Sequence, residues 1–138
     1  MMAWIPIIVG ALTLGAWLFG SEAMAEVLPW VFVMKPNTAL CVLLLGLALA
    51  AGPAKMVARV LSTIAGSLGL LTLLGYALGQ DLGFDSILAA DFTAADVEPF
   101  SGRMSSNTAI CLVLISLGIL LRGSIQHLRP RPSEWSLI

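Results

Sequence analysis

Two stretches of the sequence repeat one another: Met34-Lys35-Pro36-Asn37-Thr38-Ala39-Leu40-Cys41 and Met104-Ser105-Ser106-Asn107-Thr108-Ala109-Ile110-Cys111. When they are extended back to Val27 and Val97, seven of fifteen positions are identical at a constant separation of 70 residues. Asn, Thr, Pro and Cys are not residues in which the chain is rich, so shared composition does not explain the match. The sequence therefore indicates an internal duplication. Each copy begins with polar residues and continues into an apolar segment without a charged residue.

The composition around these copies is typical of a membrane protein. Of the 138 residues, 59% are hydrophobic and 11% are charged, whereas about a quarter of the residues are charged in an ordinary soluble protein. We predict an all-α integral membrane protein, in which four transmembrane helices form a bundle of two tandem helical hairpins. Repeat 1 covers about residues 3–52, repeat 2 covers about 56–122, and 123–138 form a cytoplasmic tail, with the start of a further membrane segment as the alternative.

The distribution of charge predicts the orientation of the chain. Five of the seven basic residues lie in the connection 52–59 or after residue 121, whereas seven of the eight acidic residues lie in 20–36 or 80–106. By the positive-inside rule, both chain ends lie in the cytoplasm and the two acidic connections face outward. Lys35 and Arg103 are the only basic residues on the outer side.

The first and third apolar segments, about 1–19 and 56–79, contain small residues on which neighbouring helices can pack closely. The candidate packing positions are Gly10, Gly15, Gly66, Gly69 and Gly75. The alternative is that glycine is simply commoner in membrane helices than in soluble ones. Leu14-Gly15 and Leu74-Gly75 match at a separation of 60 residues, which indicates that the duplicated unit includes the preceding helix.

The second and fourth apolar segments are predicted to be short. Pro36 disfavours helix at Lys35, and Asn37 is a good N-cap, so the second helix is expected to run from Thr38 to Ala51. Fourteen residues give about 21 Å of helix against about 30 Å of hydrocarbon. The fourth helix is expected over 107–121, also short. Two short helices at corresponding places in two repeats point to a binding site, because their N-termini then end within the membrane depth.

The candidate binding residues are those at the two helix starts and the aromatic residues near them: Asn37, Thr38, Cys41, Asn107, Thr108, Cys111, Trp30 and Tyr76. They predict an outward-facing pocket for a small polar or anionic molecule, a quinone or a lipid head group. The alternative is structural: Asn and Thr only cap the helices, and both cysteines are small apolar packing residues. The identity of any bound lipid, quinone or pigment stays open.

Three stretches also resemble a known family. Met34 to Leu49, Leu74 to Asp85 and Ser101 to Ala109 are similar to the N-terminal multi-helix membrane region of bacterial sensor histidine kinases and diguanylate cyclases. In that family the region precedes PAS, GGDEF or kinase domains. The resemblance implies a multi-pass protein of the bacterial inner membrane that acts as a sensory input domain for signal transduction. No such output domain follows within these 138 residues.

The sequence does not predict an enzyme. It has no glycine-rich phosphate loop and no Ser-His-Asp set, its single histidine, His127, has no metal-ligand spacing, and no cofactor or metal is predicted. The few basic residues flank apolar segments, so nucleic acid is not an expected partner. The expected partners are membrane lipids and the helices of other membrane proteins, in a homodimer or a larger complex. Two functions remain: a sensory input domain, or a small structural accessory subunit that packs on a larger membrane complex.

Overall fold

Each of the four apolar segments forms a helix in the computed structural model. The structure describes residues 3–19, 26–27, 29, 33–52, 55–80, 83 and 103–128. In this part of the chain there is no strand, and the helices in order are α1 (Trp4–Phe19), α4 (Pro36–Ala51), α5 (Met56–Leu78) and α6 (Ser106–Leu128). The predicted all-α architecture of four helices is confirmed.

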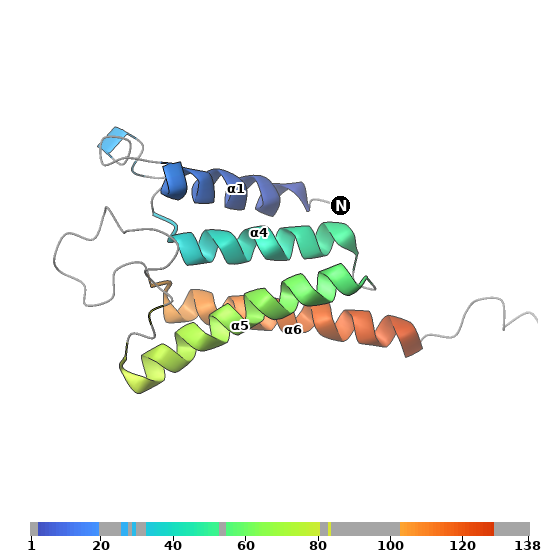
Figure 1. Ribbon diagram of the computed structural model, residues 1–138. Helices are drawn as coiled ribbons and strands as arrows, with labels where there is room; N and C mark the ends of the chain where they lie inside the picture. Colours follow the sequence, from blue (N-terminus) through green and yellow to red (C-terminus); the bar gives the residue numbers. More distant parts are fainter. Residues whose placement is uncertain are drawn as a thin grey trace, which may run out of the picture.

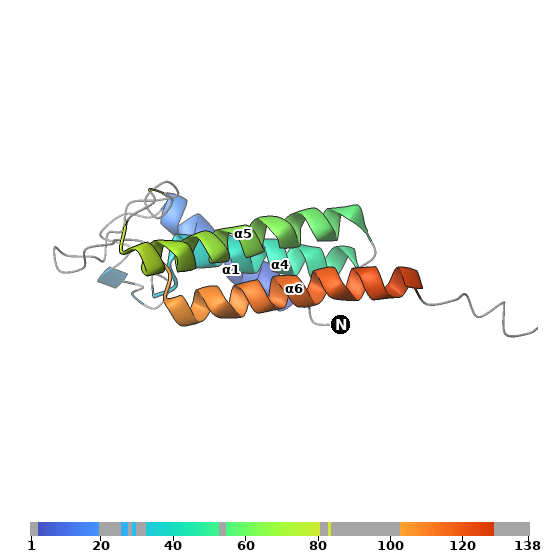
Figure 2. The same ribbon diagram turned by 90° about the horizontal axis from the view of Figure 1, so that it is seen from below.

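The helices form an open row rather than a closed ring (Figure 1). Among these elements, α1 packs against α4 alone, whereas α4 packs against α1, α5 and α6. The helices α5 and α6 cross at an angle in the view of Figure 1 and lie side by side in that of Figure 2. As a result α4 is covered on opposite faces, while α6 keeps one face without a neighbouring helix.

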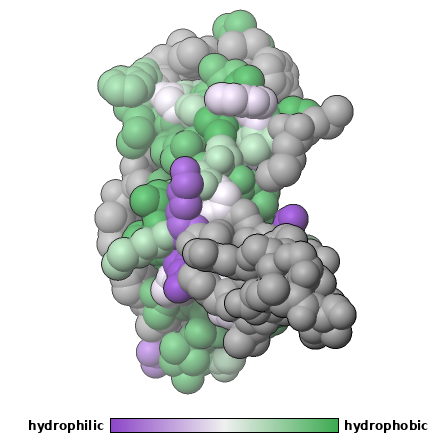
Figure 3. All heavy atoms as spheres, turned by 90° about the vertical axis from the view of Figure 1, so that its right-hand side faces the viewer, coloured by the Kyte–Doolittle hydropathy of each residue, from purple (hydrophilic) through white to green (hydrophobic). Residues whose placement is uncertain are grey.

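Two of the helices are long and apolar enough to cross a membrane, over Met56–Leu78 and Ser106–Ile125. The other two, α1 and α4, are apolar but have 16 residues each. Large hydrophobic side chains are exposed on all four helices. Figure 3 looks along the helices onto the end where α5 begins, and it shows hydrophobic residues over much of this end with hydrophilic ones gathered near its middle.

The helix starts differ from the prediction. Asn37 was expected to cap α4, but the helix already begins at Pro36, and Lys35 is the N-cap residue in an extended conformation. Proline suits this first helical position because its missing N–H has no helical partner to lose. The predicted capping role of Asn37 is therefore wrong. In the second copy Ser105 caps α6, because its Oγ accepts a hydrogen bond of 3.2 Å from the Thr108 N–H.

The end of α6 also differs from the prediction. The helix was expected to stop at Leu121 before Arg122, but it continues to Leu128 and has 23 residues. An arginine is tolerated there because its long side chain can reach away from apolar surroundings. Only α4 is therefore a short member of the repeated pair.

The duplication is visible as two equivalent hydrogen bonds. The Trp17 indole Nε1 donates to the Met34 carbonyl at 2.8 Å, and the Tyr76 hydroxyl donates to the Met104 carbonyl at 3.0 Å. The two methionines are 70 residues apart, as the repeated phrase requires, whereas the two aromatic residues are 59 apart. In each copy, the first helix of the hairpin is thus fastened to the chain just before the second.

Close helix contacts follow the same alignment. A Cβ atom at Gly10 would lie 2.9 Å from the Ala39 carbonyl oxygen, and one at Gly69 would lie 3.1 Å from that of Ala109. Gly10 and Gly69 are again 59 residues apart. The sequence analysis matched Leu14-Gly15 with Leu74-Gly75 and so predicted a separation of 60 residues between the first helices of the two repeats. This separation is wrong by one residue.

The remaining glycines behave differently from one another. A Cβ at Gly66 would lie 3.0 Å from the Ser116 Cβ, so this glycine lets α5 and α6 approach closely. Gly75 makes room for Arg103, whose Nη2 atom would lie 3.0 Å from a Cβ there. At Gly15 a Cβ would meet no atom within 4 Å, and the predicted packing role finds no support.

Candidate functional site

A pocket of about 400 Å³ lies between the starts of α4 and α6. Eight of the nine described lining residues form four pairs that are 70 residues apart in the sequence, and Tyr76 is the ninth. The pairs are Val33 with Arg103, Met34 with Met104, Lys35 with Ser105, and Thr38 with Thr108. The two copies of the repeated phrase thus face each other across one cavity.

The backbone at the two helix starts exposes this lining. Lys35 has φ −65° and ψ 150°, so the chain enters α4 extended and turns into the helix only at Pro36. The first turns of α4 and α6 carry backbone N–H groups without helical partners, and helix N-termini carry a partial positive charge. Both ends therefore favour a negatively charged or strongly polar group in the pocket.

Side-chain charge adds to this preference. The described lining contains two cationic side chains, Lys35 and Arg103, and no anionic one. Arg103 is only 7% exposed, and its Nη2 donates to the Gln80 carbonyl at 2.8 Å. Its guanidinium carbon lies 5.0 Å from the centroid of the Tyr76 ring, which is a cation–π contact. The pocket thus has a fixed cation on one wall.

Tyr76 joins three parts of the site. It belongs to α5, its ring lies beside the Arg103 guanidinium, and its hydroxyl donates to the Met104 carbonyl just before α6. The side chain is 44% exposed. A change at the pocket wall therefore bears directly on the contact between α5 and the start of α6.

Three of the predicted binding residues line the pocket: Thr38, Thr108 and Tyr76. The asparagines do not belong to the described lining, since Asn37 is buried in the first turn of α4 and Asn107 is exposed on α6. Trp30 lies outside the residues that the structure describes.

The two cysteines occupy different surroundings. Cys41 is fully buried against α5, with its Sγ 3.9 Å from the Ala65 carbonyl oxygen. Cys111 is exposed on α6. The idea that both thiols line one shared cavity is therefore wrong.

Sequence reasoning missed Lys35 and Arg103 as lining residues. The signal that could have found them was present, because they are the only basic residues in connections that otherwise carry acidic ones. In the described residues, no group of three or more His, Cys, Asp or Glu side chains could hold a metal ion.

Comparison with protein-family models, with curated proteins and with solved structures finds no match. The resemblance to sensor membrane regions therefore stays a prediction.

Proposed function

We propose that this chain is the membrane-embedded sensory input region of a bacterial signalling protein, and that it is not an enzyme. The pocket between the starts of α4 and α6 receives the stimulus, a small polar or anionic molecule. One observation carries the proposal: the duplicated phrase, the most distinctive part of the sequence, supplies eight of the nine lining residues that the structure describes.

The chemistry of the lining supports this choice of ligand. Two cations, two helix N-termini and the hydroxyls of Thr38, Ser105 and Thr108 favour an anionic or hydrogen-bonding group. Met34 and Met104 add apolar surface. A cavity of about 400 Å³ lies within the usual range of small-molecule pockets, about 300 to 1,000 Å³. The ligand that fits is a small molecule with one charged or polar end.

Membrane insertion is part of the proposal. The helices α5 and α6 have the length and composition that a crossing needs. With 16 residues, α4 is about 24 Å long against a hydrocarbon layer of about 30 Å. If its far end reaches the cytoplasmic boundary, its start and the pocket lie slightly below the outer surface. Exposed apolar side chains on all four helices are consistent with contact to lipid.

The helix α6 carries the signal away from the pocket. It begins beside the lining residue Ser105 and continues to Leu128, near the end of the bundle where α4 ends (Figure 1). A ligand shifts this helix only if it binds two arrangements of the pocket with different affinity. Tyr76 and Arg103 are placed to provide that difference, because they connect the pocket wall to α5 and to the segment before α6.

Removing one pocket hydroxyl tests the site. Inorganic phosphate and acetate serve as probes with the full chain in lipid nanodiscs, and each is expected to raise the thermal midpoint of unfolding. Thr38→Val keeps the shape of the side chain and removes one donor, so we expect about ten-fold weaker binding, as for a lost hydrogen bond to a charged group.

Ser67→Ala is the control, since Ser67 lies on the exposed face of α5, donates to the Thr63 carbonyl of its own helix and lines neither pocket. Unchanged probe affinity in this variant is the expected result. A protein that binds neither anion, or a Thr38→Val variant that binds both as tightly as the parent, contradicts the proposed site.

A small structural accessory subunit is the second candidate, and α1 favours it. Of the other described helices it packs against α4 alone, and Trp4, Ile8 and Leu12 lie exposed at four-residue spacing along it. Such a stripe suits packing against a helix of a larger complex. The mass of the polypeptide from native membranes separates the two candidates. A mass well above 14.5 kDa favours the sensor, whereas 14.5 kDa together with a stoichiometric partner favours the subunit.

A further inference from the structure

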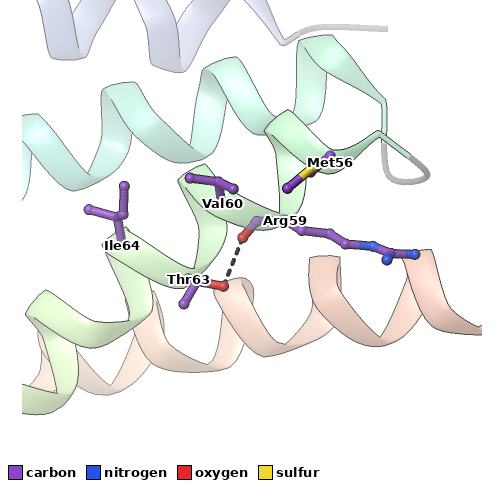
Figure 4. A pocket seen from close by; sticks show the side chains of 5 residues that line it. All are labelled: Met56, Arg59, Val60, Thr63 and Ile64. Carbon is purple, nitrogen blue, oxygen red and sulfur yellow. Dashed lines mark hydrogen bonds between the residues drawn. The ribbon is translucent and has the colours of Figure 1, made fainter.

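We infer that a groove on α5, at the end of the bundle opposite to the pocket, binds an anionic phospholipid. The groove has a volume of about 540 Å³ and is lined by Met56, Arg59, Val60, Thr63 and Ile64 (Figure 4). All five residues belong to the first turns of α5. The inference rests on the membrane insertion that is part of the proposed function.

Arg59 supplies the recognition of charge. Its Nε atom is buried and finds no hydrogen-bond partner in the described part of the chain. A charged group that loses a hydrogen bond to water without gaining one in the protein is costly, so an anion beside the guanidinium offsets part of that cost. Figure 4 shows the Arg59 side chain extended toward the end of the bundle where α5 begins. The cation therefore lies at one end of the groove.

The rest of the groove is apolar. Met56, Val60 and Ile64 are exposed to 80%, 47% and 45% without covering side chains from another described helix. The Thr63 hydroxyl donates to the Arg59 carbonyl at 2.8 Å, so it is occupied within α5 (Figure 4). The polar part of Thr63 is thus not offered to a ligand.

This order of features matches a phospholipid better than a free anion. A phosphate in water would use Arg59 and leave the apolar wall without a partner. A phospholipid places its phosphate on the guanidinium and an acyl chain against Val60 and Ile64. Arg59 lies three residues, or about 4.5 Å, from the start of α5, a depth at which phosphate groups border the hydrocarbon.

The neighbouring cation Lys55 provides a matched control. It is exposed at the N-cap of α5 and does not line the groove. Arg59→Gln and Lys55→Gln remove the same charge four residues apart. If the protein surface attracts anionic lipid only in a general way, both variants lose the same share of the lipid preference. If the groove is a specific site, Arg59→Gln loses the preference and Lys55→Gln does not.

The experiment uses the full chain in vesicles of phosphatidylcholine with about a quarter phosphatidylglycerol, with the retained lipid identified by native mass spectrometry. We expect about five-fold preferential retention of phosphatidylglycerol, the ratio expected for one basic residue near an anionic surface. Arg59→Gln is expected to abolish the preference, and Lys55→Gln to keep it. Arg59→Lys retains the charge without the fork of donors and is expected to keep part of the preference, which shows that loss in the glutamine variant is not misfolding.

Three results overturn the inference while the membrane location stands: no preference in the parent protein, equal loss in both glutamine variants, or loss of the preference on addition of inorganic phosphate. The last result identifies a site for small anions. A chain that a carbonate wash removes from the vesicles overturns both the inference and the proposed membrane location.

Discussion

The two hairpins have the same design and different surroundings. In each, an aromatic residue of the first helix donates to a methionine carbonyl, and a glycine packs against the carbonyl of the equivalent alanine. Yet Cys41 is fully buried, whereas its equivalent Cys111 is exposed. The reason is position in the row: α4 lies between α1 and α5, whereas no described helix lies on the far side of α6. A duplicated sequence therefore does not guarantee a duplicated environment.

The second hairpin has features that the first one lacks. Trp17 is 2% exposed and fills space between helices, whereas Tyr76 is 44% exposed and lies against Arg103. The position equivalent to Arg103 is Val33. One copy thus mainly holds the structure together, while the other places a cation and a phenol at the pocket.

The glycine contacts offer the largest expected effect on this comparison. A Cβ at Gly10 would lie 2.8 Å from the Leu43 backbone nitrogen, so Gly10→Ala forces α1 and α4 apart. We expect a loss of about 3 kcal/mol in the free energy of unfolding, measured in detergent micelles. Gly69→Ala is expected to cost about 1 kcal/mol, because one of its two closest neighbours is the movable side chain of Val113.

Gly15→Ala is the control for both substitutions. Its Cβ meets no neighbour, and alanine favours helix, so we expect a stabilisation of up to about 1 kcal/mol. Equal losses at Gly10 and Gly69 would mean that the two hairpin interfaces are equally tight, against the contacts described above.

The aromatic hydrogen bonds give the next effect. Trp17→Phe removes a bond to the Met34 carbonyl and leaves a cavity in a buried site, so we expect a loss of about 2 kcal/mol. Tyr76→Phe removes only the hydroxyl from a half-exposed ring, with an expected loss of about 1 kcal/mol. Unfolding free energies in micelles test the order.

A second readout separates the two aromatic residues. Tyr76→Phe is expected to change the affinity of the pocket for phosphate, since Tyr76 lines it, and Trp17→Phe is not. If Trp17→Phe alters the affinity for phosphate and Tyr76→Phe does not, Tyr76 takes no part in binding.

The cysteines give the smallest effect and the clearest contrast in burial. Cys41→Ser puts a hydroxyl into a fully buried position, with an expected loss of about 1.5 kcal/mol. The Cys111 side chain is exposed, so the free energy of unfolding of the Cys111→Ser variant should stay within about 0.5 kcal/mol of that of the parent protein. A similar loss at both positions would mean that another chain covers α6.

Much of the fold could be predicted from the repeated phrase and the apolar runs. The predicted third helix, 56–79, agrees with α5 at Met56–Leu78. The start of α4 was misplaced because Pro36 was read as a barrier before the helix, although proline also suits its first position. The end of α6 was misplaced because Arg122 was taken for the end of an apolar span, although a helix can continue past it.

The site was predictable only in part, for a geometric reason. The repeat pointed to Thr38 and Thr108, which do line the pocket. It pointed equally to the asparagines and cysteines, because sequence equivalence says nothing about which side of a helix meets a neighbour. That choice depends on how the hairpins pack, and the open row leaves α4 and α6 with different neighbours.

The length of α6 gives it leverage. Its 23 residues form a rod of about 35 Å, and a tilt of about 5° at the pocket end displaces the other end by about 3 Å. Among the described helices none packs on the outer face of α6, so no described helix blocks this movement. A small tilt at the pocket end is thereby enlarged to more than half a helical turn where α6 ends.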